Sequence, residues 1–125
     1  LGKSPQHDPR LEQLRVLARQ ARDNLLKGDF KKLGKVFNEN TVVQRTLHKH
    51  LVCEKFEEII SIAQDFNTLG CKVNGAGGDG GSIAILTDGD MSRKRELQNS
   101  LNKAGFMTIP IYLSRRGLRV WKVEK

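Results

Sequence analysis

The sequence predicts an α+β fold, with helices in the first half of the chain and short β-strands around one helix in the second half. Apolar residues recur at three- and four-residue steps over about 9–67, whereas short β-type runs bounded by glycine and asparagine occupy about 70–123. The 125 residues and 38% hydrophobic content are typical of one domain, 1–125, with its own core. This order favours a mainly antiparallel, four-stranded sheet covered by about four helices.

Three amphipathic helices are expected before residue 68. The first follows Asp8-Pro9, an N-cap residue with proline at the first helical position, and ends at Gly28. A break at 67–70 ends the third. The apolar stripes comprise Leu11, Leu14, Ala18, Ala21 and Leu25 in the first helix, Phe30, Leu33, Phe37, Leu47 and Leu51 in the second, and Phe56, Ile59, Ile60 and Ala63 in the third.

The second half is predicted to hold four strands and one helix. The strands are expected at 71–74, 82–86, 108–113 and 118–123, and the last two are joined by a turn-length connection at 114–117. The helix is expected at about 91–104, with Asp88 or Asp90 as its N-cap.

Composition narrows the classes of partner. The net charge of +8 favours anionic partners such as phosphorylated metabolites, nucleotides or nucleic acid, although a solvated basic surface explains it equally well. No apolar run approaches the roughly 20 residues of a membrane span, so no membrane partner is expected. Cys53 and Cys71 lack the spacing of a disulfide scaffold or zinc site, which indicates reduced thiols in the cytoplasm. The start at Leu1 indicates a piece of a longer protein.

The most distinctive stretch is KVNGAGGDGGSIAIL at 72–86. It contains GxGxxG, but a dinucleotide site needs a helix directly after this motif, and a strand follows here. A Walker loop needs a lysine where Ser82 stands. What the glycines do permit is positive φ, an anion-accepting set of N–H groups, or the close approach of another loop. A wide glycine hairpin is the structural alternative.

Residues 72–85 resemble the third signature of the galactokinase, homoserine kinase, mevalonate kinase and phosphomevalonate kinase (GHMP) superfamily. That signature is a lysine, two residues, Gly-Ala-Gly-Gly-Gly-Gly and an apolar strand. Residues 28–40, GDFKKLGKVFNEN, are similar to the entry of a family helix, and 56–70 are similar to the helix that leads into the glycine loop. Among its members, the chain most resembles bacterial sugar kinases of galactokinase-like or heptose-kinase type.

The resemblance implies the ferredoxin-like C-terminal lobe of an ATP-dependent kinase that transfers the γ-phosphoryl group to a sugar hydroxyl. In this family ATP and Mg are bound mainly by an N-terminal lobe, whose phosphate loop and catalytic residues have no counterpart in this sequence. The implied partners are that lobe, from the same chain, and a small-molecule substrate. No catalytic residue and no metal ligand are expected here, and the 125 residues alone should be inactive.

The resemblance also implies site residues. The phosphate and substrate cleft would be lined by Gly75, Ala76, Gly77, Gly78, Asp79, Gly80 and Gly81. Asp79 stands where most members have glycine, and a turn-forming carboxylate is favoured over a magnesium contact. Asn40 and Gln44 interrupt the apolar face of the second helix, so they either bond to neighbouring backbone or overlook a cleft. The cleft alternative makes Asn38, Thr41 and Gln44 possible acceptor-binding residues.

Two other classes compete with a kinase lobe. A basic α+β module would bind nucleic acid through its sheet, but only Tyr112 and Trp121 are available on the strands to stack bases, so nucleic acid is not the expected partner. A helical dimerisation domain would bind no ligand. His48 and His50 lie about 200° apart on a helix and cannot chelate one metal from it.

Overall fold

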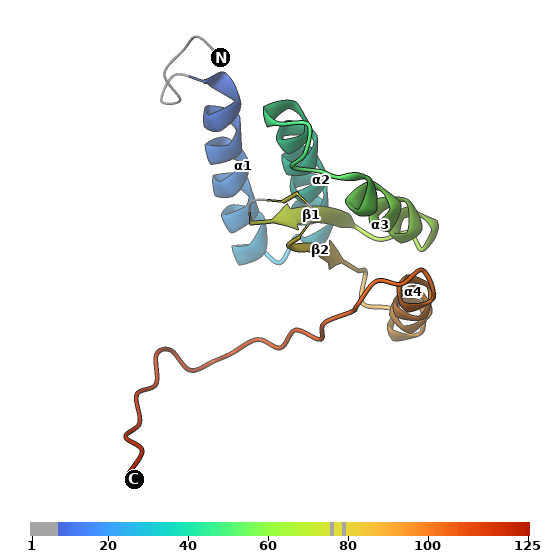
Figure 1. The fold of residues 1–125 in the computed structure, drawn as a ribbon. Coiled ribbons are helices and arrows are strands. Elements are labelled where there is room, and N and C mark those ends of the chain that lie inside the picture. The colour runs from blue at the N-terminus through green and yellow to red at the C-terminus, as the bar shows by residue number, and fades with distance from the viewer. Residues whose placement is uncertain (1–7, 76, 79) are drawn as a thin grey trace.

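The computed structural model describes residues 8–75, 77–78 and 80–125, which form four helices and a two-stranded antiparallel sheet (Figure 1). The element order is α1 (Pro9–Leu26), α2 (Phe30–Leu47), α3 (Glu54–Asp65), β1 (Gly70–Asn74), β2 (Ser82–Leu86) and α4 (Met91–Lys103). The predicted α+β class is confirmed, because all four expected helices and the first two expected strands form. Helix α2 is shorter than its apolar stripe, and Leu51 lies beyond its end.

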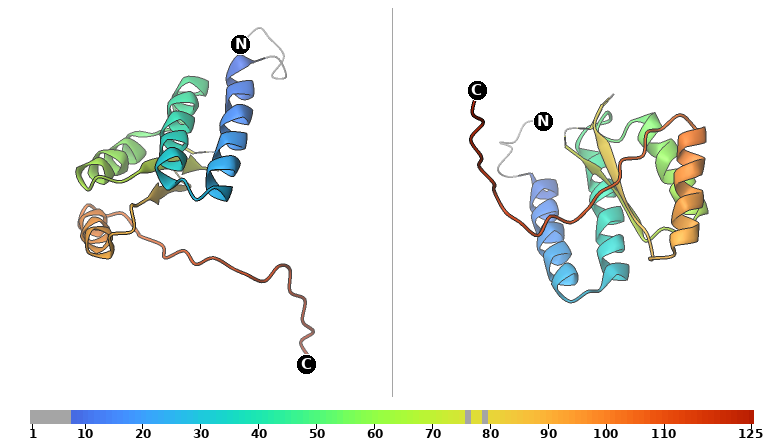
Figure 2. Two further views of the ribbon diagram at one scale, coloured as in Figure 1. Left: turned by 180° about the vertical axis from the view of Figure 1, so that it is seen from behind. Right: turned by 90° about the horizontal axis from the view of Figure 1, so that it is seen from below.

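The prediction of a four-stranded sheet is not met in the described residues, since 108–113 and 118–123 form no strand. The chain after α4 leaves the body as an extended segment (Figures 1 and 2). Its apolar side chains are exposed, from 64% at Ile109 to 95% at Leu118. The alternating pattern suits a strand, but a strand forms only against a neighbour whose backbone groups are free to pair, and no described strand lies beside this segment.

Short polar side chains cap the first turns of α1 and α4. Asp8 is the N-cap of α1, and its Oδ1 accepts a hydrogen bond from the Arg10 backbone N–H at 2.9 Å. Asp90, rather than Asp88, caps α4, because its Oδ1 accepts from the backbone N–H groups of both Ser92 and Arg93 at 3.0 Å. These bonds to the charged carboxylate lower the pKa of Asp90.

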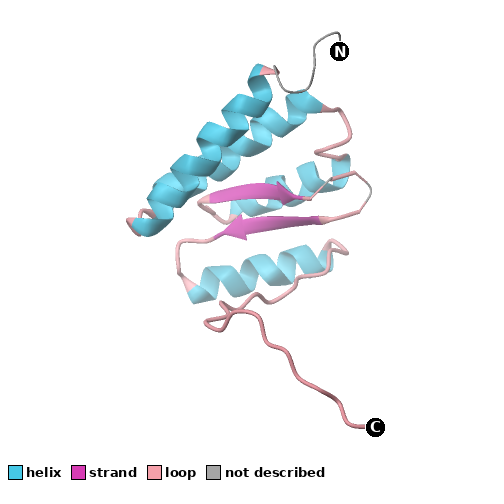
Figure 3. Cartoon of the chain, turned by 90° about the vertical axis from the view of Figure 1, so that its left-hand side faces the viewer, coloured by secondary structure: helices cyan, strands magenta, loops and turns pink. Residues whose placement is uncertain are grey.

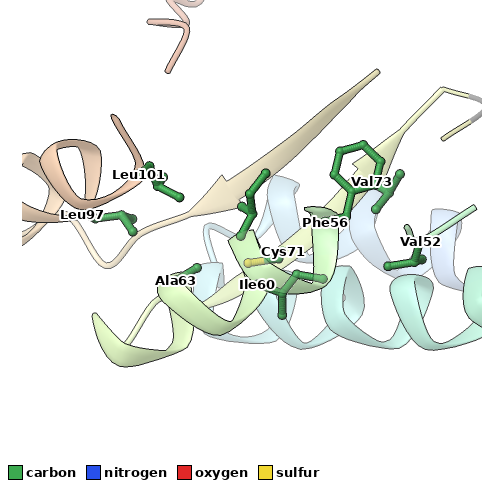
Figure 4. Packing of buried hydrophobic residues seen from close by; sticks show 9 residues of the cluster. Val52, Phe56, Ile60, Ala63, Cys71, Val73, Leu97 and Leu101 are labelled. Atoms are coloured by element: carbon green, nitrogen blue, oxygen red, sulfur yellow. The ribbon is translucent and has the colours of Figure 1, made fainter. Parts of the chain in front are cut away.

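The main core lies between one face of the sheet and helices α3 and α4 (Figure 4). Val73 is completely buried there, and the cluster joins β1 to both helices. Its buried members are Val52, Phe56, Ile59, Ile60, Ala63, Cys71, Val73, Leu97 and Leu101. A smaller cluster of Leu17, Val36 and Val43 joins α1 to α2. Figure 3 shows the resulting arrangement, with α3 behind the strands and α1 and α2 on the β1 side of the sheet.

Helix α2 lies directly against the start of β1. A Cβ atom on Gly34 of α2 would lie 2.3 Å from the carbonyl oxygen of Leu69, and one on Gly70 would lie 2.1 Å from the carbonyl oxygen of Gly34. Both distances are far below a van der Waals contact, so any side chain at either position would push the helix off the strand. The two glycines therefore set the spacing between α2 and the sheet.

We predict that Gly34→Ala lowers the free energy of unfolding by about 1–3 kcal/mol, the usual cost of overpacking a close contact. The new methyl group would force apart two backbone segments, which cannot yield as a flexible side chain would. Urea unfolding followed by circular dichroism measures the change. Gly117→Ala is the matched control, because a Cβ atom there meets nothing within 4 Å. Equal effects of the two substitutions would contradict the proposed backbone contact.

Acid should weaken the N-cap of α1 in a defined pH window. Hydrogen bonds from the Arg10 side chain and backbone lower the pKa of Asp8 from 3.8 to about 2. A lowered folded-state pKa means that the charged carboxylate stabilises the fold above pH 3.8 and loses this effect as the pH falls toward about 2. Asp8→Asn cannot titrate, so the stability gap between wild type and variant should narrow across this window. Unfolding free energies at several pH values test this, and parallel curves would refute it.

Candidate functional site

The glycine loop at 75–81 connects β1 to β2 and takes backbone conformations that favour glycine. The φ angles are +70° at Gly75, +68° at Gly77, +79° at Gly78 and +105° at Gly81. These are left-handed values that residues with a Cβ atom rarely adopt. The positive φ expected from the sequence is thus confirmed at four positions. Two of the predicted cleft residues, Ala76 and Asp79, lie outside the described residues.

The loop rests on the connection between α2 and α3. The backbone N–H of Gly78 donates to the carbonyl oxygen of His50 at 2.9 Å. A Cβ atom on Gly77 would lie 2.1 Å from the carbonyl oxygen of Leu51, so only glycine allows this approach. The sequence left open whether the glycines admit an anion or another loop, and at Gly77 and Gly78 the structure shows a neighbouring loop.

Other glycines of the loop face open space. A Cβ atom built at Gly75, Gly78 or Gly80 meets no atom of the described residues within 4 Å, leaving out the adjoining residues. Gly75 and Gly78 are explained by their positive φ, whereas Gly80 has neither a positive φ nor a close neighbour. The fold of the described residues gives no reason for glycine at position 80. A ligand that approaches the bare main chain at this point would supply one.

Three polar side chains of α2 bind the outer edge of β1, the edge that does not pair with β2. Asn38 Oδ1 accepts from the Cys71 backbone N–H at 2.9 Å, and the Thr41 hydroxyl donates to the Cys71 carbonyl oxygen at 2.8 Å. Gln44 Nε2 donates to the carbonyl oxygen of Val73 at 3.3 Å. The three candidate acceptor-binding residues therefore lie in one row along α2, and each replaces a backbone partner that a further strand would supply.

The two amides that interrupt the apolar face of α2 keep unused acceptors. Asn40 Oδ1 and Gln44 Oε1 are buried and have no hydrogen-bond partner among the described residues. For Gln44 the structure shows the first of the two predicted alternatives, a bond to neighbouring backbone. Its second polar atom remains available, so the side chain is only half satisfied.

Arg45 fixes both ends of the connection on which the glycine loop rests. Its guanidinium donates to both carboxylate oxygens of Glu57, at 2.6 and 2.9 Å, and thereby ties the end of α2 to the first turns of α3. This fork geometry is the strongest form of an ion pair and raises the pKa of Arg45. The pair is half-exposed and joins the helices on either side of the 48–52 connection, on which the loop rests.

The other described polar groups near the site bind backbone, lie exposed or are buried. Lys72 Nζ donates to the carbonyl oxygen of Val73 at 3.0 Å, next to the loop. The rings of His48 and His50 lie 5.3 Å apart, centre to centre, in the exposed connection. Burial raises the pKa of Cys71, which disfavours its thiolate. Over the described ranges, no group of three or more His, Cys, Asp or Glu side chains is placed to hold a metal ion.

Sequence reasoning missed the support of the loop. The loop contacts His50 and Leu51, which lie about 25 residues earlier in the chain, and Arg45 pairs with Glu57 across a helix connection. No local sequence pattern predicts such contacts. It also missed the contact between Gly34 and Gly70. The available signal was Gly34, which stands inside a predicted helix without a turn to make, whereas Gly70 was assigned to the break at 67–70.

Comparison with known proteins decides the family. Residues 21–105 match the family described as "GHMP kinases C terminal". The chain belongs to this family. The match covers α2, α3, both strands, the glycine loop and α4, and it confirms the resemblance seen in the sequence. In the described residues, no helix of this GHMP kinase C-terminal domain is long and apolar enough to cross a membrane.

Two proteins similar in sequence or structure indicate which members of the family the chain resembles. This GHMP kinase C-terminal domain is 28% identical over 118 residues to the mevalonate kinase of Thermococcus sibiricus. The aligned region covers 90% of this chain and 34% of that protein. The domain superposes with a TM-score of 0.62 and 27% identity on the crystal structure of L. major mevalonate kinase in complex with R-mevalonate, over 78% of this chain and 30% of that one. The chain thus spans about a third of each relative. Both are mevalonate kinases, so the expected closeness to galactokinase-like and heptose kinases is not supported.

We predict that Thr41→Val lowers the free energy of unfolding by about 1–3 kcal/mol, because the substitution leaves the buried Cys71 carbonyl oxygen without its donor. Thr46→Val is the matched control, since the Thr46 hydroxyl bonds only within its own helix, to the Val43 carbonyl oxygen at 2.7 Å. Chemical denaturation of both variants measures the difference. If both variants were equally stable, the bond between α2 and β1 would contribute nothing.

We predict that two alanine substitutions in the glycine loop differ in their effect on stability. Gly77→Ala should lower the free energy of unfolding by about 1–3 kcal/mol, because it combines positive φ with a clash against Leu51. Gly80→Ala should leave stability within about 0.5 kcal/mol of wild type, the usual range for surface changes away from close contacts. Thermal unfolding of the two variants measures this, and destabilisation by Gly80→Ala would show a contact that the structure lacks.

Proposed function

We propose that this chain is the C-terminal lobe of an ATP-dependent kinase that phosphorylates a hydroxyl group of a small molecule. The observation that carries the proposal is the bare main chain at Gly75 and Gly80, which faces open space while the rest of the loop is fixed on the 48–52 connection. A structural hairpin would require no glycine at position 80. A phosphate group or a second loop approaching the backbone would require it.

In this proposal the residues described here position the substrates and do no covalent chemistry. Phosphoryl transfer is accelerated chiefly by positioning and by stabilisation of charge around Mg-ATP, and the chain contributes a preformed wall to that site. ATP and Mg would be held mainly by the N-terminal lobe of the longer enzyme. The open backbone at Gly75 and Gly80 fits the close approach of phosphates, and the net charge of +8 favours an anionic ligand.

Mevalonate is the leading candidate for the acceptor, replacing the sugar expected from the sequence. The relative with a bound ligand in its crystal structure holds R-mevalonate, and both relatives are mevalonate kinases. The sequence left Asn38, Thr41 and Gln44 as possible acceptor-binding residues. Their bonds to β1 support a positioning role, in which α2 fixes the strand that leads into the loop.

A kinase assay on the full-length gene product tests the proposal. With Mg-ATP, mevalonate should yield phosphomevalonate and ADP, galactose should yield no product, and the 125 residues alone should be inactive. The competing nucleic-acid function is tested by titrating an oligonucleotide at two salt concentrations. Tight, salt-sensitive oligonucleotide binding without phosphorylation of any small alcohol would overturn the kinase proposal.

The matched glycine variants connect the structure to activity. Gly80→Val in the full-length enzyme should leave unfolding unchanged but reduce kcat/KM by about 100-fold, the effect expected when reacting groups are displaced by about 1 Å. Gly117→Ala, in the exposed C-terminal segment, should leave both unchanged. Full activity of Gly80→Val would show that no ligand approaches the loop at this position.

A further inference from the structure

Asn74, the last residue of β1, lies directly before the first glycine of the loop. Its side chain is partly exposed, and the one hydrogen bond that it makes among the described residues is long, 3.5 Å from Nδ2 to the Ser82 Oγ. Gly75 has a φ of +70°, and a Cβ atom built there meets no atom of the described residues within 4 Å, leaving out the adjoining residues. The side-chain amide of Asn74 therefore lies next to a bare and accessible stretch of main chain.

The backbone nitrogen of Gly75 is not held by a hydrogen bond within the described residues. Asn74 pairs with Ser82 in the last pair of the ladder, so Gly75 lies just beyond the paired part of β1. Its N–H group donates to no acceptor in the described part of the chain. A hydrogen-bonded N–H group would have to give up its acceptor before its nitrogen could form a new bond, and this cost is absent here.

The other six asparagines of the chain lack this environment. Five lie inside helices, and the N–H group that follows each of them belongs to the same helix, where it donates to the carbonyl oxygen four residues earlier. The sixth, Asn67, is followed by Thr68, whose N–H donates to the Ala63 carbonyl oxygen at 3.4 Å and whose β-branched side chain crowds the backbone. The five helical residues are Asn24, Asn38, Asn40, Asn99 and Asn102.

We propose that Asn74 is a site of spontaneous deamidation, at which the backbone nitrogen of Gly75 closes a succinimide ring that water then opens. The nitrogen gives its proton to hydroxide and attacks Cγ of Asn74. The N–Cγ bond forms, the Cγ–Nδ2 bond breaks, and the side-chain nitrogen takes up a proton and leaves as ammonia. Water adds to either carbonyl carbon of the five-membered ring and breaks its bond to nitrogen. Overall one water is consumed, one ammonia is released, and the product is aspartate or isoaspartate.

Either product alters the entry to the glycine loop. Aspartate at position 74 carries a negative charge at neutral pH, and isoaspartate carries the same charge and also adds one methylene group to the main chain where β1 ends. In the proposed kinase this charge lies beside the main chain of Gly75, which fits the approach of phosphates. The expected loss of activity rests on that proposed function, whereas the deamidation itself does not.

Peptide mass spectrometry of the full-length gene product, incubated in buffer at neutral pH, tests the proposal. Cleavage after Lys72 and Arg93 releases 73–93, which contains no other asparagine and no glutamine, so deamidation of this peptide reports Asn74. Asn74 should deamidate at least about tenfold faster than each of the other asparagines, a difference of about 1.4 kcal/mol in activation free energy. Isoaspartate should be among the products. Equal rates at all asparagines, or deamidation of Asn74 only in the urea-unfolded chain, would overturn the proposal.

Two variants separate the modification from its effect on activity. Asn74→Gln should stay unmodified, because attack on the longer side chain requires a six-membered ring. It should keep its own starting activity while the wild type loses activity in step with deamidation. Asn74→Asp mimics one product and should lower kcat/KM by about tenfold, as expected for one added charge within about 10 Å of an anionic ligand.

The outcomes distinguish the modification from the proposed function. Deamidation without loss of activity would support the modified site and count against phosphates beside the loop. An equal rate of modification in the Asn74→Gln variant would show that no ring closes at this position and would overturn the proposal.

Discussion

Helix α2 and strand β1 approach so closely that no side chain fits between Gly34 and Gly70, and three polar side chains of α2 then bind the backbone of β1. The close approach makes these bonds possible, because short side chains such as that of Thr41 reach a strand only when the helix lies directly on it. These bonds satisfy backbone groups at the outer edge of β1. If such a group were buried without a partner, it would cost about 1–3 kcal/mol of stability. The sheet can therefore end at β1 without a further strand.

The same helix also determines where the glycine loop lies. The body of α2 holds β1, which leads into the loop, and the chain leaving its C-terminal end forms the 48–52 connection, whose carbonyl oxygens contact Gly77 and Gly78. The Arg45–Glu57 ion pair joins the end of α2 to α3 across this connection. A glycine-rich loop would ordinarily be the most adaptable part of a protein. Here Gly77 and Gly78 contact the 48–52 connection, while Gly75 and Gly80 face open space. This is the form of preorganisation that a positioning element requires.

The sequence predicted what depends on local pattern, and the rest depends on contacts that no local pattern encodes. Helix caps such as Asp90 and the positive φ of the loop follow from short-range chemistry, and both were predicted. The strands expected at 108–113 and 118–123 have the same alternating pattern as β2, but a strand also needs a neighbour, and the described chain supplies none. The roles of His50 and Leu51 were missed because they act through main-chain carbonyl oxygens, which every residue possesses. The expected sugar acceptor came from a resemblance among whole enzymes, and not from a contact, and the two relatives, both mevalonate kinases, do not support it.

The glycines of the loop separate into three physical classes, and the separation bears on function. Gly75, Gly78 and Gly81 are required by backbone conformation, and Gly77 by both conformation and contact. Gly80 is required by neither. Glycine weakens a fold through the entropy that it adds to the unfolded chain, and at Gly80 neither backbone conformation nor a contact among the described residues offsets this cost. In the proposed kinase, a ligand phosphate or the neighbouring lobe would explain this glycine, whereas a solvent-exposed hairpin would not.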